Sequence, residues 1–241
     1  MDELLQKITD DWRLFCGVDP KIKSIKPLIE AGTATYAQAH EYAVRLGEIL
    51  HGSFMKYAGQ MTTVDGQLIY DAAEGILKPL LGISAEDVAD VCEAIQSDMN
   101  RITGVSLAAI KPSVSENRIE GIVTNALKAA TLEESDLAEN MVNLNQHVVD
   151  TSVRQNARFH HDAGLRTVIV RKSETPYVGT DKRGRKYSVP CDWCEGLAGT
   201  YEYGTAPSEV YHRHAGCRCE TSFVSGKTWQ DVWSKEVTWR E

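Results

Sequence analysis

Apolar residues recur every three or four positions over most of the first 163 residues, and this period is typical of amphipathic helices packed on a common core. Thr33 or Thr35 is expected to cap the second of these helices, and Ser84 the fourth. The pattern predicts helices over residues 3–16, 34–58, 67–81, 84–102, 116–130 and 133–163.

The last of these predicted helices changes character along its length. Leu137, Met141, Leu144 and Val148 step by four, three and four, which indicates a helix lying along a partner. Beyond Thr151 the segment is much more polar, so we expect its second half to protrude and to carry the chain into another region.

The pattern changes again after Gly164. Residues 166–171 form a β-branched run typical of a strand, and residues 220–224 form another. Residues 177–180 and 186–189 flank a turn-rich basic segment and predict a β-hairpin. The fold class expected is therefore α+β: a mainly α-helical N-terminal region followed by a small α/β C-terminal domain.

The division expected is a helical domain over 1–154, a cysteine- and histidine-bearing domain over 155–225 and a tryptophan-rich tail over 226–241. Trp229, Trp233 and Trp239 lie in that tail, and we expect them to pack against this protein or a partner. Two glycines bear on the second predicted helix: Gly47 and Gly52 weaken it, although small residues there also permit close packing.

Charge is spread unevenly along the chain, whose formal net charge is −8. Residues 1–154 hold 13 Lys/Arg against 23 Asp/Glu, a net of −10, whereas residues 155–241 hold 13 against 11, a net of +2. The acidic front would repel phosphates and is a poor nucleic-acid binder by itself. The sequence shows neither a long apolar run nor a signal-peptide pattern, so we expect synthesis in a reducing cytoplasm and no membrane association.

Four of the six cysteines lie within a short stretch near the C-terminus, together with two histidines. In the pattern C-x2-C-x19-H-x2-C-x-C, the first pair is Cys191 and Cys194, and the second group is His214, Cys217 and Cys219. Two short knuckles separated by a loop gather soft ligands around a tetrahedral Zn²⁺ ion. Because thiols stay reduced in the cytoplasm, a metal site is favoured over a disulfide or scattered core cysteines.

Zinc needs four ligands, and this stretch offers more than four. We expect Cys191 and Cys194 to bind together with two of His214, Cys217 and Cys219, and the remaining group to support a ligand by hydrogen bonding. His212 is a further candidate in the same stretch. So many protein ligands favour a closed structural site over a catalytic one, which keeps a position open.

Several cysteines and histidines outside this stretch are expected to have structural roles. Cys16 and Cys92 are expected to be small core residues, and His40 and His51 to lie on partly exposed helix faces. The neighbouring His160 and His161 are explained by the helix dipole at the end of their helix.

The motif around the cysteines resembles the C-terminal signature of phage Mu F-like minor head proteins, also called head morphogenesis or minor capsid proteins. The matching elements are Cys191-x2-Cys194, the Leu197-x-Gly199 step and His214-x2-Cys217-Arg218-Cys219 leading into a strand. The specific match covers residues 155–225 approximately. The resemblance implies a virion component of the phage head, present in few copies, that contacts portal or major capsid protein and acts in head assembly or DNA passage.

Two other functions remain open at this level. A zinc-containing enzyme or toxin-like module would use Glu195, His212 or the His160–His161 pair as acid–base groups, although no nucleophile–base spacing accompanies them. A DNA-binding zinc module would use the basic turn Lys182–Lys186 to contact phosphate. No enzymatic activity is expected, and we expect no appended enzyme domain.

Overall fold

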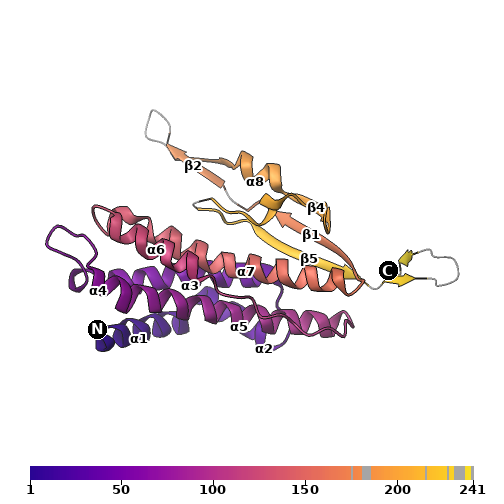
Figure 1. Ribbon diagram of the computed structural model, residues 1–241, viewed down its shortest axis with the longest axis horizontal. Coiled ribbons are helices and arrows are strands. Elements are labelled where there is room, and N and C mark those ends of the chain that lie inside the picture. Colours follow the sequence, from indigo (N-terminus) through magenta and orange to yellow (C-terminus); the bar gives the residue numbers. More distant parts are fainter. Residues whose placement is uncertain (175, 181–185, 215, 227, 231–236, 240–241) are drawn as a thin grey trace.

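The computed structural model of the chain describes residues 1–174, 176–180, 186–214, 216–226, 228–230 and 237–239. In 176–180, 186–190, 228–230 and 237–239 only the backbone is described. The fold is α+β, as the sequence predicts. A layer of helices forms one side of the molecule, and a small antiparallel sheet lies over α7 (Figure 1).

Seven α-helices, with short 3-10 and π segments between them, account for the described part of the chain up to residue 162. They are α1 (Asp2–Val18), α2 (Pro20–Glu30), α3 (Tyr36–Met55), η1 (Ala58–Gln60), α4 (Tyr70–Ala72), η2 (Ala73–Leu77), α5 (Lys78–Ile102), α6 (Glu116–Lys128), η3 (Glu133–Ser135) and α7 (Leu137–Asp162). None of the helices that the structure describes combines the length and the apolar composition needed to cross a membrane.

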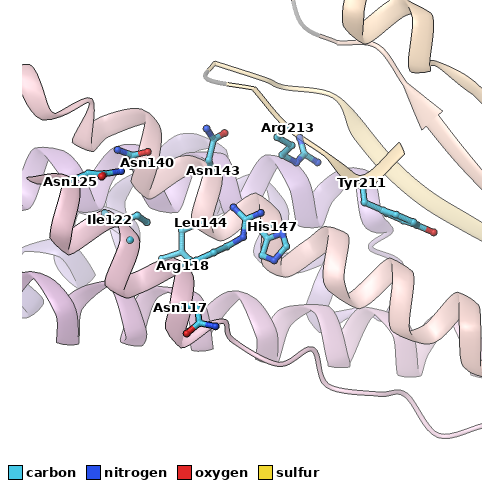
Figure 2. A pocket seen from close by; sticks show the side chains of 11 residues that line it. Asn117, Arg118, Ile122, Asn125, Asn140, Asn143, Leu144, His147, Tyr211 and Arg213 are labelled. Carbon is cyan, nitrogen blue, oxygen red and sulfur yellow. The ribbon is translucent and has the colours of Figure 1, made fainter. Parts of the chain in front are cut away.

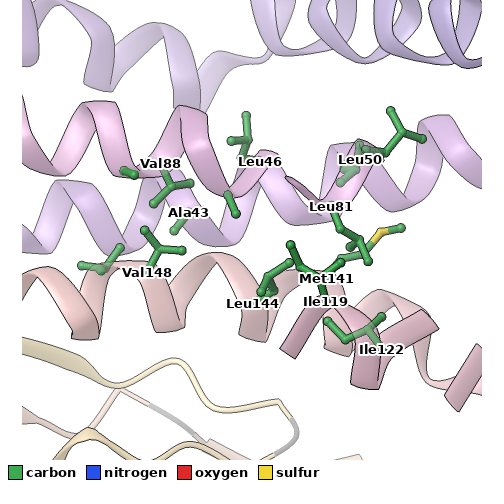
Figure 3. Close-up of a cluster of buried hydrophobic side chains, with 14 of the residues drawn as sticks. Ala43, Leu46, Leu50, Leu81, Val88, Ile119, Ile122, Met141, Leu144 and Val148 are labelled. Carbon is green, nitrogen blue, oxygen red and sulfur yellow. The ribbon is translucent and has the colours of Figure 1, made fainter. Parts of the chain in front are cut away.

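The core is formed where the apolar faces of α3, α5, α6 and α7 meet (Figure 3). Leu46, Leu81, Val88 and Leu144 are among its fully buried side chains. Cys16 and Cys92 also lie in this core, as predicted. At the crossing of α3 and α7, a Cβ atom added to Gly47 would lie 2.8 Å from the Cα atom of Val142. The prediction that glycine permits close helix packing is thus confirmed at this position.

Two helix starts that the apolar pattern does not predict have proline in the first turn. Helix α2 begins at Pro20, where the missing N–H of proline costs nothing, and the Asp19 carboxylate accepts hydrogen bonds from two backbone N–H groups. Ser84 does not cap a helix. It lies inside α5, which begins at Lys78 with Pro79 in its first turn, and the buried Ser84 hydroxyl pairs with Asn145.

The sheet contains β1 (Arg166–Lys172), β4 (Gly199–Glu202) and β5 (Glu220–Gly226), with β1 in the centre and antiparallel to both neighbours. Both β1 and β5 pack on α7. The second half of α7 therefore does not protrude, contrary to the expectation from its polar sequence. Its buried residues from Thr151 onward are Thr151, Ser152, Val153, Asn156, Ala157 and His160.

The helices and the sheet share a hydrophobic core. Three residues of the C-terminal region belong to the same buried cluster as the helical residues: Ile169 of β1, Phe223 of β5, and Val210, which lies between β4 and β5. The Phe223 ring lies with its centroid 6.0 Å from that of Tyr36 on α3. The assignment of domain boundaries stays a prediction, but the sheet buries its inner face against α3 and α7.

The remaining elements are β2 (Pro176–Thr180), β3 (Lys186–Pro190), α8 (Asp192–Leu197), η4 (Ser208–Tyr211), β6 (Thr228–Gln230) and β7 (Val237–Trp239). Of these, β2 and β3 lie at predicted positions, and the others were not predicted. The predicted hairpin is confirmed by the antiparallel pairing of β2 with β3. Most of the basic turn Lys182–Lys186 lies outside the described residues. The same holds for Trp233 and for the side chains of Trp229 and Trp239.

Candidate metal centre

The first pair of cysteines is positioned by a short helix. Cys191 is the residue that caps α8, and its carbonyl oxygen accepts the first helical hydrogen bond from the N–H of Glu195. Cys194 lies one turn further on and is completely buried. Because residues three apart in a helix lie on the same side, both sulfur atoms face the second group.

A tight turn positions the second group just before β5. The N–H of Cys217 donates to the carbonyl oxygen of His214, and Gly216 adopts a φ of +73°, a conformation that other residues rarely take. The Gly216 N–H also donates to the carboxylate of Glu139 on α7 at 2.9 Å. Helix α7 thus holds this turn in place from outside the motif.

The five predicted ligands form two overlapping groups that share Cys194. Cys191, Cys194 and His214 form one, and Cys194, Cys217 and Cys219 form the other; within each group the ligand atoms lie within 4.8 Å of one another. The Nε2 atom of His214 is 3.5 Å from the sulfur of Cys191 and 3.0 Å from that of Cys194. Neighbouring ligands around tetrahedral zinc are separated by about 3.5–3.8 Å, given the usual bond lengths. The cluster can therefore hold a metal ion.

The cluster is enclosed by protein. The side chains of Cys194, Cys217 and Cys219 have no exposed surface, whereas Cys191 and His214 are partly exposed. The neighbouring Cys219 and burial raise the pKa of the Cys217 thiol. A bound cation has the opposite effect, because a coordinating thiol is deprotonated. Thiolates this close together repel one another, and a cation bound between them removes that repulsion.

Two buried arginines stand beside the sulfur atoms. A guanidinium nitrogen of Arg171 and one of Arg213 each lie 3.8 Å from the sulfur of Cys217. Arg171 also donates to the carbonyl oxygens of Val210 and His212, and Arg213 donates to that of Cys219 at 2.8 Å. A metal ion with three or four thiolates carries net negative charge, which these cations offset.

Arg213 is held by an ion pair with Asp150 of α7. Its Nε and Nη2 atoms lie 2.5 and 2.8 Å from the two carboxylate oxygens, and both side chains are almost fully buried. The Thr221 hydroxyl donates to the same carboxylate at 2.5 Å. Burial alone would raise the pKa of Asp150, but the pairing with Arg213 outweighs it and lowers that pKa. Asp150 is therefore charged, and the helical layer is joined electrostatically to the second knuckle.

His40 of α3 completes this network, which corrects the prediction of a partly exposed position. The residue is only 2% exposed, and its Nδ1 atom lies 3.2 Å from Arg213. Since a guanidinium can only donate, Nδ1 accepts from Arg213, and Nε2 lies 3.0 Å from both the carbonyl oxygen and the backbone nitrogen of Thr221. Burial and, secondarily, Arg213 lower the pKa of His40 to about 4, so the ring is neutral near pH 7.

The other predicted candidates lie apart from the cluster. Glu195 and the side chain of His212 are exposed. His160 is buried, with Nδ1 2.6 Å from the Ser225 hydroxyl and its ring edge-on to Phe223, so packing against β5 accounts for it better than the helix dipole. His161 stacks on Tyr203 with 4.5 Å between ring centroids.

Sequence reasoning missed the charged residues that surround the cysteines. Arg171 occupies a buried position in the alternating pattern of β1, in phase with Thr167 and Ile169, and this register was a usable signal. Arg213 lies inside the motif, between the two histidines. No local pattern links Asp150 or His40 to residues 213–221, because only the tertiary fold brings them together.

No family model, no curated protein and no solved structure matches the chain. What can be said about this centre therefore depends on its own geometry.

Proposed function

We propose that this chain is a non-enzymatic structural protein of a tailed-phage or prophage head, of the Mu F-like minor head type, whose Cys/His cluster holds a structural zinc ion. The observation that supports the proposal best is the enclosed cluster and its attachment to α7. Three of five candidate ligands are fully buried, and Asp150 and Glu139 hold the second knuckle against the helices.

The donor set favours zinc among the biological cations. Thiolate and imidazole ligands suit zinc, whereas magnesium and calcium take oxygen ligands. We assign Cys191 and Cys194 as ligands with two of His214, Cys217 and Cys219, and the fifth group as a hydrogen-bonding neighbour. Cys194 belongs to both groups of three, which supports its assignment as a ligand.

A structural role fits the surroundings better than catalysis does. A catalytic zinc site keeps one position open and places an acid–base group beside it. Here five candidate ligands compete for four positions, and Glu195 and the His212 side chain are exposed. The ion would instead add stability to a small sheet region whose own core is thin.

In this proposal the acidic helical layer contacts portal or major capsid protein, and the metal centre keeps the sheet fixed on that layer. The test is quantitative mass spectrometry on purified, DNA-filled particles of the phage that encodes the chain, together with binding of the full chain to purified portal and capsid proteins. We expect the chain in particles at a small fraction of the major capsid copy number, and binding to at least one of the two proteins. Its absence from particles, with no binding to either protein, would refute the assignment.

A further inference from the structure

A polar groove runs between α6, α7 and the segment 208–213, on the other side of α7 from the main helical core. One cavity of about 350 Å³ is lined mainly by polar side chains of α6 and α7, and Figure 2 shows several of them pointing toward one another. A second cavity of about 170 Å³ shares Arg118, His147 and Tyr211 with it and reaches Arg154. We call the two together the arginine groove.

The charge of the arginine groove is opposite to that of the protein, whose net charge is −8. Arg118, Arg154 and Arg213 line it, and among the described residues that form its walls only Asp150 is acidic. That carboxylate is already paired with Arg213 and accepts from Thr221.

Two of the arginines are not paired. Within the described part of the chain, no carboxylate oxygen lies within 4.0 Å of the guanidinium of Arg118 or of Arg154, whereas the neighbouring Arg158 pairs with Asp162. Asp150 attracts Arg118 only at longer range, and partial burial against the groove wall lowers the pKa of Arg118. Two cations facing one groove without a counter-charge repel each other until an anion lies between them.

The remaining groups on the walls supply neutral hydrogen bonds. Carboxamides come from both helices, at Asn117, Asn125, Asn140 and Asn143. The Oδ1 atom of Asn143 is buried and accepts no hydrogen bond from the residues that the structure describes, which is costly for a carbonyl oxygen. Asn117 and Arg118 lie in the first turn of α6, where the helix dipole favours negative charge. The groove thus offers both cationic donors and an unsatisfied acceptor.

We propose that the arginine groove binds a small molecule that carries an oxyanion, phosphate or carboxylate, and also a hydrogen-bond donor. The oxyanion lies between Arg118 and Arg154, and the donor satisfies Asn143. A volume of about 350 Å³ is in the range of small-ligand sites and too small for a duplex. This site does not depend on the proposed phage function or on the metal centre.

Calorimetric titration of the full chain tests the proposal, with inorganic phosphate in one arm and glycolate, a carboxylate with a hydroxyl donor, in the other. Sodium chloride of equal ionic strength serves as the blank, because salt screening of the protein's charges does not give a saturable heat signal. We expect saturable binding of at least one anion at one site. Arg118→Gln and Arg154→Gln should each weaken it about tenfold, the usual effect of losing one charge-assisted hydrogen bond.

Arg158→Gln is the matched control, one turn further along the same helix and already paired. It should leave the affinity unchanged within about twofold. Binding of phosphate alone or of glycolate alone identifies which oxyanion the groove accepts. The proposal is overturned if neither anion saturates, or if Arg158→Gln weakens binding as much as the two groove variants.

Discussion

Arg213 connects the two halves of the molecule through a single side chain. On one side it pairs with Asp150 of α7, and on the other it donates to the carbonyl oxygen of Cys219. A buried ion pair is a weak source of net stability, but removal of one partner leaves the other charge buried and uncompensated. The pair therefore makes the position of the second knuckle on α7 highly specific.

Asp150→Asn leaves Arg213 without its counter-charge. We expect the free energy of unfolding to fall by about 3–5 kcal/mol, measured by urea titration of the full chain. Asp162→Asn removes the exposed partner of Arg158 on the same helix and should cost less than about 1 kcal/mol. Equal losses for the two variants would show that the buried pair does not have this role.

Protonation of His147 should lower stability in acid. Burial first, and then Arg118, lower its pKa to about 4; Arg154 and Arg213 act in the same direction, and only Asp150 opposes them. In the unfolded state His147 binds a proton below about pH 6.5, whereas in the folded state it does so only near pH 4. The free energy of unfolding therefore falls progressively as the pH drops from 6.5 to 4, because only the unfolded state takes up the proton over this range.

His147→Gln removes that titration while keeping a polar side chain. In urea titrations at a series of pH values between 4 and 7, the variant should lose less stability on acidification than the wild type. The same slope in both proteins would contradict the assignment of a depressed pKa to His147.

Among the elements, apolar periodicity predicted the helix limits well wherever one face of the helix is exposed to solvent. α3, α6 and α7 begin and end within a few residues of the predicted limits. The apolar pattern did not predict α2, and it placed a helix start at Ser84 instead of Lys78; in both helices proline occupies the first turn. It also failed for α7 beyond Thr151, where polar side chains are buried and hydrogen-bonded, as for Asn156 with the backbone of Ile110 and for His160 with Ser225 of β5.

The crossing of α3 and α7 gives a prediction from two glycines of one helix. Gly47→Ala places a methyl group 2.8 Å from the Val142 backbone, and we expect a loss of about 1–3 kcal/mol from overpacking. Gly52→Ala meets no atom within 4 Å and should stabilise α3 by about 0.5–1 kcal/mol. Thermal unfolding of both variants should thus give shifts of opposite sign, and shifts of the same sign would contradict the close contact.

At the scale of the whole molecule, the sequence predicted the α+β class and the five ligand candidates, because each is encoded by local spacing. It did not predict how the sheet lies on the helices. That contact depends on Asp150 and His40, two buried polar residues whose partners are distant in the sequence. A charged residue in the sequence is ordinarily assigned to the surface, and only its tertiary partner makes burial favourable.

The central claim is that the cluster around Cys194 holds a zinc ion, and the metal content of the full chain tests it most directly. Elemental analysis of protein purified without added metal should give about one zinc ion per chain. Cys194→Ser should abolish binding, and Cys16→Ser, a change in the helical core, should retain it. Protein that contains no metal and is equally stable with and without a chelator would contradict the account.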